Sequence, residues 1–199
     1  MKNIIVVSLL VFFAKNVFAQ KDSLSFDEHD KYIYYKLVDQ PGVNADTLYN
    51  RGLYFLTAAY PKKTLGLSKS DKENHSLTGV GSYMISKKAL VGNSEGGEMH
   101  YTLTIEVKDL KYRYWLTDFV YQPYQRNRYG SSEPVAGGEI PLEKASAKLS
   151  KSDFSNYLDQ VIANSKQVGD RLRAYMLKAS SLAKKQEVKK VNKISTKEW

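Results

Sequence analysis

The stretch that decides the fold is Met99–Lys108, MHYTLTIEVK, together with the segment that follows it, Lys111–Tyr121, KYRYWLTDFVY. In the first segment apolar residues alternate with polar ones, which is typical of a strand with one buried and one exposed face. The second segment is rich in tyrosine, which suits a half-buried β surface. Only Asp109-Leu110 lies between them, and so short a link joins antiparallel strands. These residues therefore predict a β-hairpin.

Further elements are predicted on both sides of this hairpin. A strand is expected at 31–38 and a helix at about 45–60, followed by two short strands at 63–67 and 77–85. After the hairpin, residues 122–150 hold three prolines and three glycines without periodicity, and we expect a long loop there. The resulting order of one strand, one helix and four strands predicts an α+β fold with an antiparallel sheet.

A final helix is predicted after this loop. Ser150 and Asp153 form a capping-box pattern, and apolar residues then recur at steps of three and four up to Leu182. Such a helix would be roughly 43 Å long, whereas a typical strand spans about 17–20 Å, so we expect the helix to overhang the sheet. Its apolar stripe fits two arrangements: packing on the sheet, or contact with a partner helix or a second copy.

Several segments resemble a known family of proteins. Tyr32–Tyr35 and Asp46–Arg51 are similar to its first strand and helix, and Thr102–Lys108 with Lys111–Tyr114 is similar to its central hairpin. The family is a domain of unknown function with a TBP-like fold, found in secreted proteins of Bacteroidetes. The resemblance implies a two-layer α+β fold, in which a curved antiparallel sheet carries helices on one face and leaves the other exposed. It implies no activity and no catalytic residues.

The first nineteen residues are typical of a secretory signal peptide. A positive start with Lys2 precedes the largely apolar segment 4–14, and Val17-Phe18-Ala19 has the small residues of a cleavage site. We expect cleavage before Gln20 and export through the Sec pathway to the periplasm or the cell exterior. The chain contains no cysteine, so we expect neither a lipoprotein nor thiol chemistry.

The remaining chain is divided by composition. We expect a flexible N-terminus at 20–30, a single domain at 31–183 and a basic flexible tail at 184–199, with no transmembrane helix after the signal peptide. Residues 20–142 carry fifteen basic and fifteen acidic residues, whereas residues 143–199 carry thirteen basic and six acidic ones. This excess of positive charge predicts contact with an anionic envelope component through a basic arm at Lys184, Lys185, Lys189 and Lys190. A partner protein on the final helix is the other expected partner, and because of secretion we expect no nucleic acid.

Aromatic and basic residues are concentrated between 112 and 129. We predict a binding platform for sugars, bases or peptide side chains. Its candidate residues are Arg113, Trp115, Tyr121, Tyr124, Arg126, Arg128 and Tyr129. The alternative is that these tyrosines only fill half-buried β surface.

No residue pattern indicates a catalytic, cofactor or metal site, and we assign no residues to any of them. The expected function is therefore a non-catalytic binding or interaction module of the cell envelope. The alternative is a hydrolase acting on envelope glycan or peptide. It would use His100 with Glu106, or the loop that holds Glu95 and Glu98.

Overall fold

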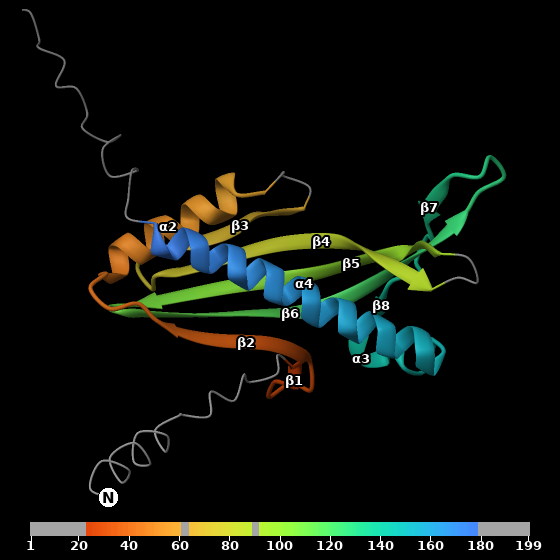
Figure 1. The fold of residues 1–199 in the computed structure, drawn as a ribbon, viewed down its shortest axis with the longest axis horizontal. Coiled ribbons are helices and arrows are strands. Elements are labelled where there is room, and N and C mark those ends of the chain that lie inside the picture. Colours follow the sequence, from red (N-terminus) through yellow and green to blue (C-terminus); the bar gives the residue numbers. More distant parts are fainter. Residues whose placement is uncertain (1–22, 61–63, 89–91, 179–199) are drawn as a thin grey trace, which may run out of the picture.

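A computed structural model of the chain describes residues 23–60, 64–88 and 92–178. They form one antiparallel sheet with two long helices on one of its faces (Figure 1). The strand order is β1-β2-β6-β5-β4-β3, and β7 and β8 pair separately with β6. The strands are β1 (Ser25–Phe26), β2 (Tyr32–Asp39), β3 (Leu65–Asp71), β4 (Ser76–Lys88), β5 (Asn93–Lys108), β6 (Lys111–Arg126), β7 (Ser132–Pro134) and β8 (Ile140–Pro141). The helices are α2 (Ala45–Ala58), α3 (Leu142–Ala145) and α4 (Lys151–Leu177).

The predicted hairpin is confirmed as the pair β5 and β6, in which Lys108 opposes Lys111 and Ile105 opposes Tyr114. Both strands are longer than expected, with 16 residues each, which corresponds to about 53 Å of extended chain. Helix α4 has 27 residues, or about 40 Å. Both strands are thus longer than the described helix, which removes the length difference on which the expected overhang rested.

The segment 122–150 is not a single long loop. Strand β6 continues through Arg126, and β7 folds back on it with Gln125 opposite Glu133. Strand β8 then pairs with β6 through Ile140 and Tyr121, and α3 follows directly. Proline and glycine in this segment therefore mark the turns between short elements rather than an absence of structure.

The predicted N-terminal cap of the final helix is confirmed, since the backbone N–H of Asp153 donates to Ser150 Oγ at 3.1 Å. The apolar stripe faces the sheet, with Val161, Val168 and Leu172 buried. Of the two arrangements considered for this stripe, the helix adopts packing on its own sheet. Ala179 and Leu182, also expected in the stripe, lie outside the described residues.

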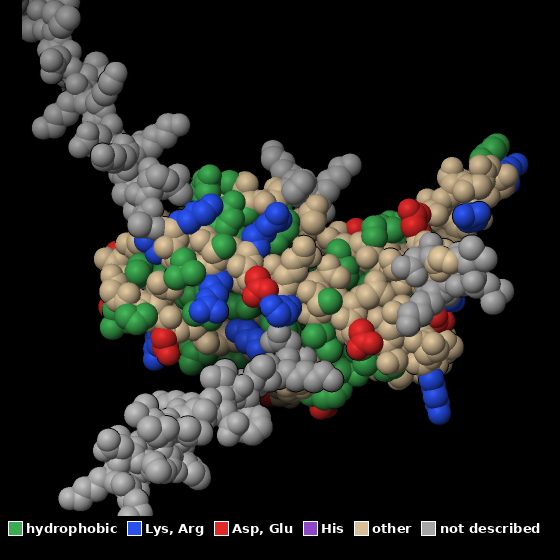
Figure 2. All heavy atoms as spheres, in the orientation of Figure 1, with side chains coloured by type: hydrophobic (Ala, Val, Ile, Leu, Met, Phe, Trp, Pro, Cys, Tyr) green, Lys and Arg blue, Asp and Glu red, His purple; other side chains and the backbone are tan. Residues whose placement is uncertain are grey.

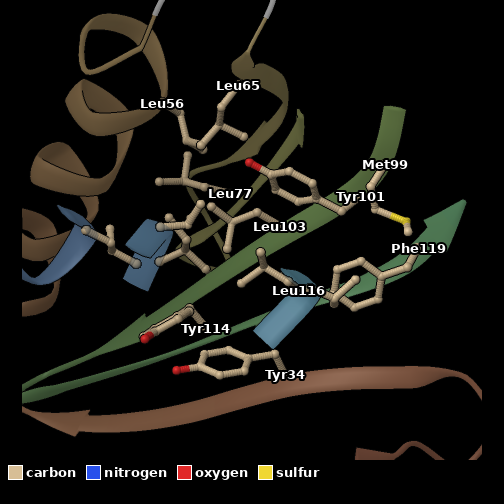
Figure 3. Close-up of a cluster of buried hydrophobic side chains, with 14 of the residues drawn as sticks. Tyr34, Leu56, Leu65, Leu77, Met99, Tyr101, Leu103, Tyr114, Leu116 and Phe119 are labelled. Atoms are coloured by element: carbon tan, nitrogen blue, oxygen red, sulfur yellow. The ribbon is translucent and has the colours of Figure 1, made fainter. Parts of the chain in front are cut away.

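The core lies between the sheet and the two helices. Figure 3 shows side chains from the strands and from α2 meeting in this layer, among them Leu56, Leu77 and Leu103. Asn44 caps α2 by accepting a hydrogen bond from the backbone N–H of Thr47 at 2.9 Å. Helix α2 packs against α4 and β5, so both helices cover the same face of the sheet. No helix in the described ranges is long and apolar enough to cross a membrane.

At the N-terminus, part of the segment expected to be flexible is structured. Strand β1 pairs with β2, and the rings of Phe26 and Tyr32 have their centroids 4.5 Å apart. The proposed signal peptide, at residues 1–19, lies outside the described residues. So does the basic arm at Lys184, Lys185, Lys189 and Lys190.

Candidate binding surface

The two faces of β6 have different surroundings. Tyr112, Tyr114 and Leu116 are buried under the helices. The residues between them, Arg113 and Trp115, therefore point to the opposite side of the sheet, because side chains alternate along a strand. That side carries no helix of the described chain (Figure 1).

We call this uncovered side the open face. Its large apolar side chains are between 44% and 57% exposed and come from β2 and β4: Tyr35, Leu37, Val80 and Met84. In the strand register Tyr35 lies opposite Trp115 on β6. Between the apolar side chains of β2 and those of β4 lie the polar residues of β5. They are Thr102, Thr104 and Glu106, which were expected on the exposed face of that strand. The open face thus has apolar flanks and a central strip of hydroxyl groups.

Arg113 contacts two other side chains on the open face. Its Nε donates to Glu106 Oε2 at 2.7 Å, and its guanidinium lies 5.5 Å from the centroid of the Trp115 ring. The Glu106 carboxylate raises the pKa of Arg113, because it stabilises the charged guanidinium, and the Tyr35 hydroxyl adds to this effect. Arg113, Glu106 and Trp115 thus form a small network of contacts, and contacts that exist before binding lower the cost of ordering a surface.

A shallow groove runs beside this network. It has a volume of about 240 Å³ and is lined by Tyr35, Leu37, Glu106, Lys108, Lys111, Tyr112 and Arg113. The wall contributed by β2 is apolar, whereas the lysines stand at the turn between β5 and β6. A ligand in this groove would meet aromatic and aliphatic surface on one side and positive charge at one end.

A second hollow lies at the far end of β6, under the hairpin that β6 forms with β7. This cleft has a volume of about 710 Å³ and is lined by Ser94, Glu95, Tyr124, Gln125, Arg126, Gly130 and Ser132. The Tyr124 hydroxyl donates to Glu98 Oε2 at 3.1 Å. Burial raises the pKa of Tyr124, and the carboxylates of Glu98 and Glu95 add to the shift, so the phenol stays neutral.

The predicted platform residues fall into separate places. Arg113 and Trp115 lie on the open face, whereas Tyr124 and Arg126 line the cleft. Nine residues of strand separate Trp115 from Tyr124, or about 30 Å. Because of this distance, one small ligand cannot touch both groups.

The other platform residues differ in exposure. Arg128 and Tyr129 lie in the turn between β6 and β7, where the Tyr129 side chain is 82% exposed and the Arg128 guanidinium stands 5.6 Å from its ring centroid. Tyr121 is instead in the core at 4% exposure, and its hydroxyl donates to the Gly96 carbonyl. Tyr121 therefore supports the fold and is not part of a surface.

The residues considered for hydrolysis are arranged unequally. His100 and Glu106 are six residues apart on one strand, or about 20 Å, and Glu106 is already paired with Arg113. Glu95 and Glu98 both lie near Tyr124, and His100 Nε2 is 3.9 Å from Glu98 Oε2. Within the described ranges, no three His, Asp or Glu side chains are grouped so that they could hold a metal ion.

Tyr35 and Leu37 are site residues that the sequence reading missed. The segment KYIYYKLV is apolar at nearly every position, so it carries no alternation that separates a buried from an exposed face. Only the pairing of β2 beside β6 brings these two side chains next to Arg113 and Trp115. The sequence does predict a strand at 31–38, and a strand must pair with another strand. This pairing was the one signal that could have pointed to Tyr35 and Leu37.

The arrangement described above defines a class of protein: a two-layer α+β domain whose curved antiparallel sheet has helices on one face only. Residues 34–122 match the family described as "Domain of unknown function (DUF4468) with TBP-like fold", which confirms the resemblance found in the sequence.

Two crystal structures are similar to this chain. One is a DUF4468 family protein from Bacteroides ovatus, with 12% sequence identity and a TM-score of 0.58, covering 79% of this chain and 92% of the other. The second is a TBP-like protein from Parabacteroides distasonis, with 14% identity and a TM-score of 0.59, covering 75% of this chain and 95% of the other. At such identities the likeness concerns the fold. No curated protein matches the chain in sequence.

Proposed function

We propose that this protein is a non-catalytic binding module of the cell envelope and that the open face is its ligand site. The observation that carries the proposal is the uncovered side of the sheet, where Tyr35 and Leu37 stand exposed on the strand next to Trp115, and Val80 and Met84 stand exposed on β4. Neighbouring exposed apolar side chains such as Tyr35 and Leu37 are typical of interaction sites, since a monomer gains nothing by keeping them in water.

The side chains of the open face favour an extended ligand of the envelope, either a glycan or a polypeptide segment. Aromatic rings such as Tyr35 and Trp115 contact sugar rings and peptide side chains over a large area. The Arg113–Glu106 pair and the threonine hydroxyls of β5 offer hydrogen bonds to polar groups between those rings. A long sheet face suits a long ligand better than a compact one.

The envelope location rests on the signal-like sequence of residues 1–19. We propose export with cleavage before Gln20, and contact of the basic C-terminal segment with an anionic envelope component. Expression in a Bacteroides host, followed by cell fractionation and N-terminal sequencing of the recovered protein, tests this. A chain recovered from the cytoplasm with Met1 still present would contradict it.

Removing the two aromatic rings of the open face tests the ligand site. The double variant Tyr35→Ala with Trp115→Ala is expected to weaken capture on purified envelope glycan or on an envelope protein fraction by roughly 30-fold or more, as for other buried aromatic anchors. Neither side chain is in the core, so circular dichroism should show an unchanged fold.

A second double variant separates the two hollows. Tyr124→Ala with Arg126→Ala alters the cleft and leaves the open face intact, and we expect it to retain capture. The proposal fails if capture survives the loss of Tyr35 and Trp115. If it is lost only with Tyr124 and Arg126, the ligand site is the cleft.

A further inference from the structure

The C-terminal half of α4 carries an unbalanced positive charge. From residue 166 to residue 178 there are four cations and one carboxylate, Asp170, which pairs with Lys166 across one helical turn. The cations Arg171, Arg173 and Lys178 form no ion pair with any acidic side chain of the described residues. Figure 2 shows Lys and Arg side chains gathered on the part of the helical side that lies over α2 and this half of α4.

Aromatic rings hold two of these cations at the surface. The guanidinium of Arg171 lies 4.6 Å from the centroid of the Tyr60 ring, and Lys178 Nζ lies 4.5 Å from that of Tyr175. The apolar side chain of Leu177, which is 56% exposed, stands beside Lys178. Tyr54 on α2 is also exposed and packs against Tyr175, with ring centroids 5.8 Å apart. We call Tyr54, Arg171, Arg173, Leu177 and Lys178 the basic helix face.

The two halves of α4 differ in net charge. The N-terminal half has one lysine, Lys151, against Asp153 and Asp159. The net charge of the N-terminal half is therefore slightly negative. The excess positive charge of α4 lies in its C-terminal half, which leads into residues 179–199. Those residues add six lysines and two glutamates in sequence. The excess of basic residues therefore continues in the sequence beyond α4.

We propose that the basic helix face docks on an anionic lipid surface. Cations held at a surface next to exposed aromatic and aliphatic side chains suit the headgroup region, where amphipathic rings reside and phosphate groups supply negative charge. The apolar stripe of α4 is already buried on the sheet, so the attraction is mainly electrostatic and screened by salt. The proposal extends the proposed envelope location to a specific surface.

Docking by this face sets the orientation of the molecule. The helices cover one side of the sheet and the open face is the other (Figure 1). A protein held to lipid through α4 therefore presents Tyr35, Leu37 and Trp115 away from the bilayer. The two surfaces can act at the same time, with one holding the protein at the membrane and the other free for a ligand.

Vesicle co-sedimentation tests the proposal. The protein is prepared from Gln20 onward, so that the apolar segment 4–14 cannot insert into the bilayer. We expect binding to phosphatidylcholine vesicles with about 30% phosphatidylglycerol, because each cation near such a surface strengthens binding roughly fivefold, and no binding to vesicles of phosphatidylcholine alone. Raising the salt from about 50 to about 500 mM should abolish most of the binding.

Neutralising the three cations should then weaken binding roughly 100-fold in the variant Arg171→Gln, Arg173→Gln, Lys178→Gln. A second variant with only Arg173→Gln and Lys178→Gln keeps the contact of Arg171 with Tyr60 and should lose roughly 30-fold. This double variant still tests the proposal if the triple variant folds poorly.

The matched control neutralises three exposed lysines elsewhere: Lys69 on β3, Lys144 on α3 and Lys148 after it. It has the same net charge as the triple variant and should bind within about threefold of wild type. A third variant changes the six lysines of residues 179–199 to glutamine.

The proposal is overturned if wild type ignores phosphatidylglycerol, if the control loses as much binding as the triple variant, or if only the six-lysine variant loses binding. All of these variants keep Tyr35 and Trp115, so failure of ligand capture at those two residues would leave the vesicle result unaffected.

Discussion

At Gly169, helix α4 packs tightly against Tyr114 of the sheet, and Gly169→Ala tests this contact between helix and sheet. A Cβ at this position would lie 2.0 Å from Tyr114 Oη and 2.8 Å from Cζ of the same ring. An ordinary carbon–oxygen contact needs about 3.3 Å, so either the helix or the ring must move by more than an ångström. Tyr114 is buried on β6 and has no open space to move into.

The expected effect is a loss of stability even though alanine is the better helix former. Forcing a methyl group into a packed core costs about 3 kcal/mol at the upper end of the usual range. Replacing a mid-helix glycine by alanine returns about 1 kcal/mol. The net loss is about 2 kcal/mol in the free energy of unfolding, which urea denaturation followed by circular dichroism measures as a lower midpoint.

Gly52 on α2 supplies the matched control. A Cβ there would meet Leu77 Cδ1 at 2.9 Å and Met176 Cε at 3.3 Å, and both are terminal methyl groups of flexible side chains. Small rotamer adjustments can make this room, so Gly52→Ala should leave the stability within about 0.5 kcal/mol of wild type.

A double-mutant cycle locates the clash. Tyr114→Phe removes the hydroxyl, so Gly169→Ala should cost about 1 kcal/mol less in that background than in wild type. An equal cost in both backgrounds would place the contact elsewhere. A Gly169→Ala protein at least as stable as wild type would refute the close approach itself.

Three further substitutions test the core and the surface. Ser165 has a fully buried Oγ with no hydrogen-bond partner among the described residues, so Ser165→Ala should raise the unfolding free energy by about 1 kcal/mol in urea titrations. Tyr121→Phe removes the buried hydrogen bond to the Gly96 carbonyl and should lower the free energy of unfolding by about 1–2 kcal/mol, seen as a lower midpoint. Glu106→Gln weakens a partly exposed ion pair with Arg113, so its thermal midpoint should change by no more than about 3 °C.

The central strands were predictable because their sequence is informative at every second position. In Met99–Lys108 the alternation specifies both the strand and its buried face, and the tyrosines on β6 follow the same rule. The cap at Ser150 was equally local, since a serine followed three residues later by an acid indicates a helix start. These elements are determined by residues only a few positions apart in the chain, so the pattern that predicts them is visible in the sequence.

The site was harder to predict, because its residues meet only through strand pairing. Arg113 and Glu106 lie opposite each other across the hairpin, so their ion pair follows from the register. Tyr35 reaches Arg113 from a strand more than seventy residues earlier, and no local pattern indicates that β2 pairs with β6. The end of β6 was also predicted too early. Pro123 suggested that the strand stops at Tyr121, whereas the chain continues in β structure to Arg126.

Strand β6 packs against α4 on one face and forms part of the proposed ligand site on the other. Tyr114 points towards Gly169 and helps to seat α4, whereas the next residue, Trp115, points to the open face. Substitutions at the helix contact should therefore lower the stability while a folded molecule still binds its ligand. Substitutions on the open face should do the reverse, because Trp115 is not part of the buried core. Separate changes in denaturation midpoint and in ligand capture thus distinguish a damaged fold from a damaged site.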